Sequence, residues 1–358
     1  MNKTIMKKIT INGKKIGKDN PIFLIGEIGV NHNGNLSVAK QLIDKAVEAK
    51  IDAVKFQTFI TDDVLVKSTP KAEYAKKNNY DDESFNDMVR KLEFTREEFG
   101  ILNQYCYKKG IVFLSTPYDE KSIELLSDLK VPAYKISSGD LNNFPLIELI
   151  CKKKKPILLS TGMANLNEIK ESVEFIKKNG INEIILFQCT TNYPSSFDEI
   201  NLNVIETFQK EFPDCLIGFS DHTLGIEASI GAAAKGVKSI EKHFTLDKSM
   251  EGPDHKASLN PEELTNWSKS IRNIEKALGS FIKKPSENEL EIAKVARRSI
   301  VSRREIKIGE IIKKEDLIMK RPGTGIPPNK IKKIIGNAVR RTIPKDKIIE
   351  WDDITKDG

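Results

Sequence analysis

Short apolar runs recur along the chain and alternate with longer stretches in which apolar residues follow a helical spacing. The longer stretches include residues 36–50, 165–180 and 224–236, and each ends at lysine or glycine, where a helix is expected to stop. The short runs are five or six residues long, as is typical of buried strands. Eight such runs are present, at 22–26, 53–57, 111–115, 133–137, 156–160, 183–188, 215–220 and 239–244.

Eight repeats of a strand followed by a helix predict an α/β protein with a (β/α)8 TIM barrel in residues 21–279. A doubly wound open sheet is the alternative, but no GxGxxG motif follows the first apolar run. The step Asn12-Gly13 in "ITINGKKIG" predicts a type I′ hairpin within residues 1–20. We expect this hairpin to plug the floor of the barrel.

Beyond the barrel the chain continues into a polar linker, residues 280–295, and a second, smaller domain, residues 296–358. This domain is expected to consist of short strands and turns around "RPGTGIPP". It holds 17 Lys and Arg against 9 Asp and Glu, a balance of +8, which leaves −1 for residues 1–295 out of the total of +7. These charges alternate with isoleucine residues, and aromatic residues are almost absent. We therefore expect no nucleic-acid binding, although the domain could face an acidic substrate.

The composition describes a globular protein with a large core. The 358 residues are 39% hydrophobic and 30% charged. No apolar run approaches 18 residues, so no membrane span is expected. The beginning, "MNKTIMKKIT", lacks the apolar stretch of a signal peptide, which predicts a cytoplasmic protein. The four cysteines, Cys106, Cys151, Cys189 and Cys215, are far apart in the sequence and predict reduced, mostly buried thiols.

Polar residues gather at the carboxyl end of every predicted strand. In strand order the segments are "EIGVNHNG", "VKFQT", "STP", "YKISSGD", "STGMAN", "CTTNYP", "SDHT" and "EKHF". In (β/α)8 barrels the chemistry lies at this end of the strands. One polar strand end would mean little, but eight together predict a polar active site.

Lys55 and Lys135 lie inside apolar strands, where lysine is disfavoured unless it is paired. One interpretation is that each lysine neutralises a buried carboxylate such as Glu27 or Glu241. The other is that both lysines hold an anionic substrate. The nearby "STP", "SSGD" and "STG" segments supply hydroxyl and backbone donors that suit a phosphate or carboxylate, which favours the second interpretation.

His222 and His243 end the seventh and eighth predicted strands. Each one alone would be interpreted as a hydrogen-bonded core histidine. Because the two strands are neighbours, both side chains are expected in the barrel mouth, within reach of one metal ion. Two imidazoles with open positions suit a divalent cation such as Mn²⁺ rather than a closed zinc site. Asp221 and Glu241 flank the histidines and could be ligands, partners of the ligands or substrate contacts.

The other two histidines are given structural roles. His32 in "VNHNG" is expected to shape the turn after the first strand. His255 in "GPDHKAS" is expected to order its loop. Neither is assigned to the predicted metal site.

A family resemblance adds to this interpretation. The segments "EIGVNHNG", "VKFQT", "STP", "YKISSGD", "LSTGMAN", "CTTNYP", "GFSDHT", "EKHFTLDKSMEGPDHKASL" and "KRPGTGI" together resemble the sialic acid synthase family, in order from about residue 22 to the C-terminus. The resemblance implies a barrel followed by a C-terminal antifreeze-like (SAF) domain. It implies condensation of phosphoenolpyruvate with an N-acetylated hexosamine, which gives a nine-carbon 2-keto acid and phosphate. It also implies a homodimer in which the SAF domain of one chain covers the barrel mouth of the other.

The resemblance assigns a role to each candidate residue. The positions that match phosphoenolpyruvate-binding residues are Lys55, Thr116, Lys135, Ser138, Thr191 and Ser220. The sugar-binding positions are Tyr193, Glu241, Asp254 and, from the partner's SAF domain, Arg321. Glu27 matches the catalytic acid/base carboxylate. His222 and His243 match the ligands of a divalent metal, Mn²⁺ first, with Mg²⁺ and Co²⁺ as alternatives.

The identity of the sugar is left open by the sequence. "KFQTF" stands where enzymes that use N-acetylmannosamine often have "KHQTH", and "EKHFTLDKSMEGPDHKASL" occurs in both legionaminate and sialic acid synthases. N-acetylneuraminate synthase is favoured, and N,N'-diacetyllegionaminate synthase, which uses 2,4-diacetamido-2,4,6-trideoxymannose, is the alternative. The stretch between Lys67 and Ser84 is expected to line the sugar pocket. Two other classes remain, a Schiff-base aldolase that uses Lys135 and a non-catalytic sugar-binding barrel.

Overall fold

The structure is a computed structural model that describes residues 8–69 and 84–355. The chain divides into two compact units, Met1–Gly279 and Ser280–Gly358. The first unit ends at the residue where the sequence places the end of the barrel.

Eight parallel strands form the centre of the first unit. They are β3 (Phe23–Gly29), β4 (Ala53–Thr58), β5 (Val112–Pro117), β6 (Tyr134–Ile136), β7 (Ile157–Ser160), β8 (Ile184–Cys189), β9 (Leu216–Asp221) and β10 (Ser239–His243). Their order in the sheet is β5-β4-β3-β10-β9-β8-β7-β6, and the terminal strands β5 and β6 contact each other. Consecutive strands are therefore neighbours all the way round. This arrangement confirms the predicted TIM barrel and excludes the doubly wound sheet.

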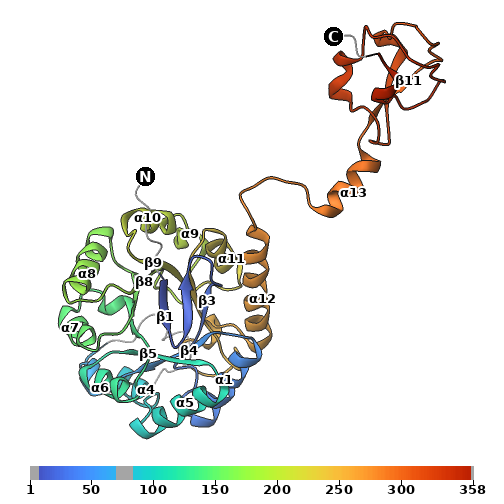
Figure 1. The fold of residues 1–358 in the computed structure, drawn as a ribbon. Coiled ribbons are helices and arrows are strands. Elements are labelled where there is room, and N and C mark those ends of the chain that lie inside the picture. The colour runs from blue at the N-terminus through green and yellow to red at the C-terminus, as the bar shows by residue number, and fades with distance from the viewer. Residues whose placement is uncertain (1–7, 70–83, 356–358) are drawn as a thin grey trace. The chain divides into compact units, whose positions relative to one another are not determined.

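Helices surround the strands (Figure 1). They are α1 (Leu36–Glu48), α2 (Thr61–Val64), α4 (Phe85–Arg90), α5 (Arg96–Lys109), α6 (Glu120–Asp128), α7 (Phe144–Lys152), α8 (Leu166–Lys178), α9 (Phe197–Ile200), α10 (Val204–Glu211), α11 (Glu227–Ala234) and α12 (Pro261–Leu278), with 3-10 turns η1 (Ser138–Asp140) and η2 (His255–Ala257). Local sequence sets their ends. In α5, Thr95 and Glu98 form a capping box, and Gly110 ends the helix at a φ of 73°. The main hydrophobic core lies between these helices and the strands.

A hairpin closes the floor of the barrel. Strands β1 (Lys8–Ile11) and β2 (Lys14–Gly17) pair antiparallel. Asn12 and Gly13 both have positive φ, as a type I′ turn requires. Isoleucines of the hairpin are fully buried and share an apolar cluster with interior residues of the strands. The floor is thus filled by apolar side chains, which leaves the carboxyl ends of the strands for polar chemistry.

The second unit has its own core of mostly isoleucine side chains. Its elements are α13 (Glu287–Ala296), β11 (Ser299–Ser302), η3 (Lys314–Asp316), β12 (Leu317–Lys320), η4 (Pro328–Lys333) and η5 (Trp351–Asp353). Helix α13 lies almost wholly within the segment expected to be a linker, because Ser286 and Glu289 form a capping box there. Within the described ranges, no helix is long and apolar enough to cross a membrane. All four cysteines lie within the described residues as buried side chains, and none of them is in a disulfide.

Candidate active site

A cavity of about 410 Å³ lies at the carboxyl ends of the barrel strands. All predicted site residues of the first unit line it: Glu27, Lys55, Thr116, Lys135, Ser138, Thr191, Tyr193, Ser220, His222, Glu241, His243 and Asp254. Arg321, the remaining predicted residue, is exposed in the second unit, where its Nε donates a hydrogen bond to the backbone oxygen of Ala296. The structure therefore brings together every barrel residue to which the resemblance assigns a role, whereas Asp221, the other candidate named from the sequence, does not line the cavity.

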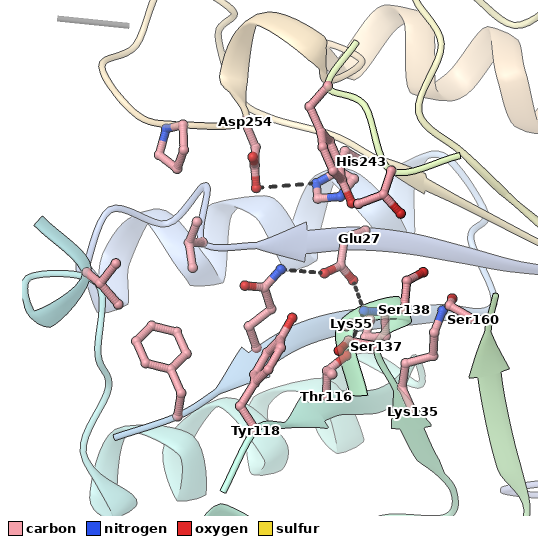
Figure 2. Close-up of a pocket in the computed structure, with 18 of the residues that line it drawn as sticks. Glu27, Lys55, Thr116, Tyr118, Lys135, Ser137, Ser138, Ser160, His243 and Asp254 are labelled. Atoms are coloured by element: carbon pink, nitrogen blue, oxygen red, sulfur yellow. Dashed lines mark hydrogen bonds and ion pairs between the residues drawn. The ribbon is translucent and has the colours of Figure 1, made fainter. Parts of the chain in front are cut away.

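Two buried lysines and two buried carboxylates form the centre of the pocket. Lys55 Nζ lies 2.7 Å from an oxygen of Glu27 and donates to Thr116 Oγ1 at 2.9 Å, contacts that Figure 2 shows. Lys135 Nζ lies 2.9 Å from Glu241, which is also 3.8 Å from Lys55. The lysines therefore have carboxylate partners and still face the cavity. The two interpretations of Lys55 and Lys135, as paired cations and as anion-binding cations, are compatible in this geometry.

The environments of the two carboxylates push their pKa values apart. Burial raises the pKa of Glu27 to about 7, and the nearby Lys55 offsets only part of this effect. Burial also acts on Glu241, but Lys135 and Lys55 together outweigh it and lower the pKa of Glu241 to about 2. Glu27 can therefore exchange a proton near neutral pH, whereas Glu241 stays ionised.

A cradle of small polar groups adjoins Lys135. The backbone N–H of Gly162 points at Ser138 Oγ, 3.0 Å away, and at Cys189 Sγ, 3.2 Å away. A Cβ at Gly162 would lie 2.0 Å from Thr191 Oγ1, so only glycine allows this close approach. Thr191 Oγ1 is buried and has no hydrogen-bond partner among the described residues. Hydroxyl and amide donors that converge beside a lysine suit a phosphate or carboxylate.

The two histidines are placed side by side, with ring centres 5.7 Å apart. Nδ1 of His222 lies 2.6 Å from the backbone oxygen of Thr190. Because that oxygen can only accept, Nδ1 carries the proton and Nε2 keeps its lone pair. Burial lowers the pKa of His222 to about 4 and that of His243 well below its usual value, so both rings are neutral.

This donor set fits a divalent cation. Within the described residues, Nδ1 of His243 has no hydrogen-bond partner, and Asp254 lies 3.8 Å from it. Because His243 is neutral, this contact is a proximity rather than an ion pair. The hydrogen bond from His222 to Thr190 is of the kind that orients metal-binding histidines. No group of three or more His, Cys, Asp or Glu in the described part of the chain could hold a metal, so two histidines would bind an ion only with water or substrate oxygens.

An apolar wall closes the other side of the pocket. Helices α2 and α4 and the residues beside them contribute side chains that line the cavity: Val64, Leu65, Phe85, Met88, Val89 and Leu92. Sequence reasoning did not assign these residues, although their spacing in α4 follows the helical period. The stretch predicted to line the sugar pocket, Lys67–Ser84, falls largely on 70–83, outside the described residues.

Other lining residues lie in strand-end segments that the sequence indicates, but were given no individual role. Ser137 and Ser160 line the cavity near Lys135 (Figure 2). Cys189 was interpreted only as a buried thiol, yet its sulfur contacts Ser138 in the cradle at 3.2 Å. Each of these three residues stands at or just after the end of a barrel strand, as expected of residues in the polar strand-end segments.

The two histidines outside the site agree with their predicted structural roles. Nδ1 of His32 accepts a hydrogen bond from the backbone of Gly34, within the turn after β3. His255 contacts Thr245 Oγ1 at 2.6 Å and Asn33 Oδ1 at 3.1 Å, which ties its loop to the barrel mouth.

The fold and the site together define a (β/α)8-barrel enzyme with its chemistry at the carboxyl ends of the strands. More narrowly, the chain belongs to the NeuB family, whose pattern matches residues 42–283, and a SAF domain follows at residues 297–355. The predicted resemblance and the predicted C-terminal domain are thus confirmed.

Named relatives cover nearly the whole chain. It is 43% identical over 349 residues to the N,N'-diacetyllegionaminic acid synthase of Legionella pneumophila, which covers 96% of this chain and 98% of that one. It is 37% identical over 338 residues to the human N-acetylneuraminate-9-phosphate synthase, and this match covers 94% of each of the two chains. The crystal structure of the sialic acid synthetase of Leptospira borgpetersenii in complex with citrate matches with a TM-score of 0.70 at 33% identity, over 80% of this chain and 95% of that one.

Proposed function

We propose that this enzyme is a transferase that condenses phosphoenolpyruvate with an N-acetylated mannosamine-type sugar and water to give a nine-carbon 2-keto acid and phosphate. The observation that carries the proposal is the pair of buried lysines beside the Gly162 cradle. Lys55 and Lys135 offer two positive charges to a substrate that carries a carboxylate and a phosphate. An enzyme that consumes phosphoenolpyruvate is expected in the cytoplasm.

The residues of the pocket can be assigned to the steps of this reaction. With its anionic groups held by the lysines and the cradle, phosphoenolpyruvate is nucleophilic at C3 and attacks the aldehyde carbon of the open-chain sugar. His222 and His243 would hold the divalent cation, whose chemistry there is Lewis-acid polarisation of the aldehyde. The new C–C bond leaves an oxocarbenium at C2. Glu27 stabilises this cation, positions the water that adds to it and takes up the proton that the water loses, while the alkoxide on the former aldehyde carbon is protonated to a hydroxyl. The tetrahedral intermediate then releases phosphate by cleavage of its C–O bond, and its C2 hydroxyl loses a proton to become the 2-keto group.

The direct test follows phosphate release by the full-length chain. We expect release from phosphoenolpyruvate only when an amino sugar and a divalent metal are both present, and loss of turnover after chelation. Turnover that survives chelation would remove the role proposed for His222 and His243. Phosphate-free condensation of pyruvate would favour the aldolase, and absence of any turnover would favour the non-catalytic barrel.

Two sugars remain candidates, and the same assay separates them. N-acetylneuraminate synthesis, the activity favoured by the sequence, uses N-acetylmannosamine. The apolar wall that includes Met88 and Val89 supports the second candidate, because a 6-deoxy sugar with a second acetamido group presents methyl groups where N-acetylmannosamine has hydroxyls. Comparing kcat/KM for N-acetylmannosamine and 2,4-diacetamido-2,4,6-trideoxymannose decides between them. A methyl group that is buried, or a hydroxyl group that is left without a partner, changes the ratio of the two kcat/KM values by about tenfold or more.

We also propose a homodimer in which Arg321 of one chain completes the site in the barrel of the other. Exposure of Arg321 and the family resemblance support this arrangement. Each of Glu27→Gln and Arg321→Ala should be nearly inactive alone at low sugar concentration. Mixed and refolded together, they should regain about one quarter of wild-type activity, because half of the dimers then contain one intact site. No recovery would place Arg321 in the site of its own chain.

A further inference from the structure

Asp221 and Lys242 form a buried ion pair directly behind the two histidines. Lys242 Nζ lies 3.0 Å from Asp221 Oδ2, and the side chains are 1% and 0% exposed. The two residues are register partners across strands β9 and β10. In the sequence each of them immediately precedes a histidine of the site, so the pair links the two backbone positions from which His222 and His243 project.

The ion pair lies on the outer face of the barrel wall. Side chains alternate along a strand, and Glu241 and His243 line the pocket whereas Asp221 and Lys242 do not. The same face carries Phe219, which belongs to the apolar core between strands and helices. A buried ion pair is costly to desolvate, and apolar replacements are often at least as stable. Stability alone therefore does not account for this pair.

Hydrogen bonds of Asp221 span His222 and fix the backbone that follows it. Its Oδ1 accepts from the backbone N–H of Thr223 at 2.9 Å and from the Thr223 hydroxyl at 2.7 Å. Its Oδ2 accepts from the Ser229 hydroxyl at 2.6 Å, which anchors the turn to helix α11. His222 is thus the central residue of a turn that one carboxylate holds from behind.

Lys242 joins this turn to the strand that carries His243. Its Nζ donates to the backbone oxygen of Thr223 at 2.8 Å in addition to its contact with Asp221. We propose that the Asp221–Lys242 pair is a positioning device that sets the spacing of His222 and His243 for a divalent cation. This inference rests on the proposed cation site and adds two residues that act through the histidines rather than on the substrate.

The test measures binding of Mn²⁺ alone to the full-length chain, by electron paramagnetic resonance of the free ion. Asp221→Asn and Lys242→Met are each expected to weaken Mn²⁺ binding by about 10- to 100-fold, the usual effect of removing a group that orients a metal ligand. The KM for phosphoenolpyruvate should change little, because the lysines and the cradle are untouched. Lys242→Arg keeps the charge and the donors and should restore most of the affinity.

The matched control is Asp52→Asn at the barrel floor. Asp52 also pairs with cations, at 2.6 Å from Lys14 and 3.0 Å from Arg272, but lies far from the histidines in the barrel. It should lower the melting temperature without weakening Mn²⁺ binding. Ser229→Ala, which removes one hydrogen bond to Asp221 and no charge, provides a milder variant that should fold and lose affinity by a few-fold.

The outcomes of this test distinguish failure of the inference from failure of the proposed cation site or of the proposed reaction. If the wild type binds Mn²⁺ and the variants of Asp221, Lys242 and Ser229 bind it equally well while melting earlier, the pair is structural and the inference is wrong. If the wild type itself binds no Mn²⁺, the cation site is wrong and the inference falls with it. Failure of the proposed reaction is detected separately, as absence of phosphate release by the wild type.

Discussion

Replacing Glu27 with glutamine is expected to lower kcat by about 10²–10⁴-fold, the usual contribution of a positioned acid or base, while the KM for phosphoenolpyruvate changes only a few-fold. Glutamine keeps the shape of the side chain but cannot carry the negative charge that stabilises the oxocarbenium. Lys55 retains Thr116 at 2.9 Å and Glu241 at 3.8 Å, so the anion-binding centre survives. Steady-state kinetics on both substrates measure the two parameters separately.

The role of Glu27 also predicts the direction in which kcat/KM changes with pH. Burial raises the pKa of Glu27 to about 7, and the ionised form is the one that the mechanism requires. The wild-type kcat/KM should therefore fall as pH decreases through 7, where the carboxylate takes up a proton, and this acid limb should be absent from Glu27→Gln. Glu241→Gln is the charge-matched control: its acid limb should persist but move to lower pH, because the negative charge of Glu241 helps to raise the pKa of Glu27, whereas Glu241 itself has a pKa of about 2. If the kcat of Glu27→Gln stays within about tenfold of the wild-type value, Glu27 is not the catalytic carboxylate and serves only to balance the charge of Lys55.

The positions of the barrel strands were accessible from the sequence because buried strands are short apolar runs. All eight strands begin within one residue of their predicted starts. The ends were less accessible. Strand β3 was expected to stop at residue 26 but continues to Gly29, since its polar Glu27 pairs with Lys55 on β4 and lies in register with His243 on β10. A polar residue that follows an apolar run cannot be assigned to the strand from periodicity alone when its partner lies on a neighbouring strand.

The polar members of the site at the strand ends were predictable, but their pairings and the apolar wall were not. The position of each residue at a strand end follows from counting strands, whereas the choice of carboxylate for each lysine depends on the register between strands. Glu241 was assigned to the sugar and stays a prediction there. The structure places it against Lys135, with Ser220 donating to it at 3.1 Å.

The ion pair behind the histidines illustrates the same limit. The two-residue period that places Glu241 and His243 on one face also places Lys242 on the opposite face. Nothing in the sequence says that Lys242 meets Asp221, because that contact depends on how β9 and β10 are aligned. Asp221 was accordingly left with three alternative roles, and the structure turns its side chain away from the pocket.

The second large effect is expected from Lys135→Met, which should raise the KM for phosphoenolpyruvate by about 30-fold or more, since truncating one partner of a buried charge contact costs about 2–5 kcal/mol. Lys135 is 3% exposed, pairs with Glu241 at 2.9 Å and lies 4.4 Å above the ring of Phe187. Without it, Lys55 alone would balance two carboxylates and an anionic substrate. The KM for the sugar should change far less. Lys14→Met, at the barrel floor, is the control and should leave both KM values unchanged.

The same lysine decides between the proposed synthase and an aldolase. Burial lowers the pKa of Lys135, as a lysine that forms a Schiff base would require, but Glu241 at 2.9 Å stabilises its ammonium form. A lysine held as a cation binds phosphate and does not attack a carbonyl. We therefore expect borohydride to trap no pyruvate on the wild-type chain, as measured by intact-protein mass spectrometry. An adduct that disappears in Lys135→Met would overturn the anion-binding role and establish the aldolase instead.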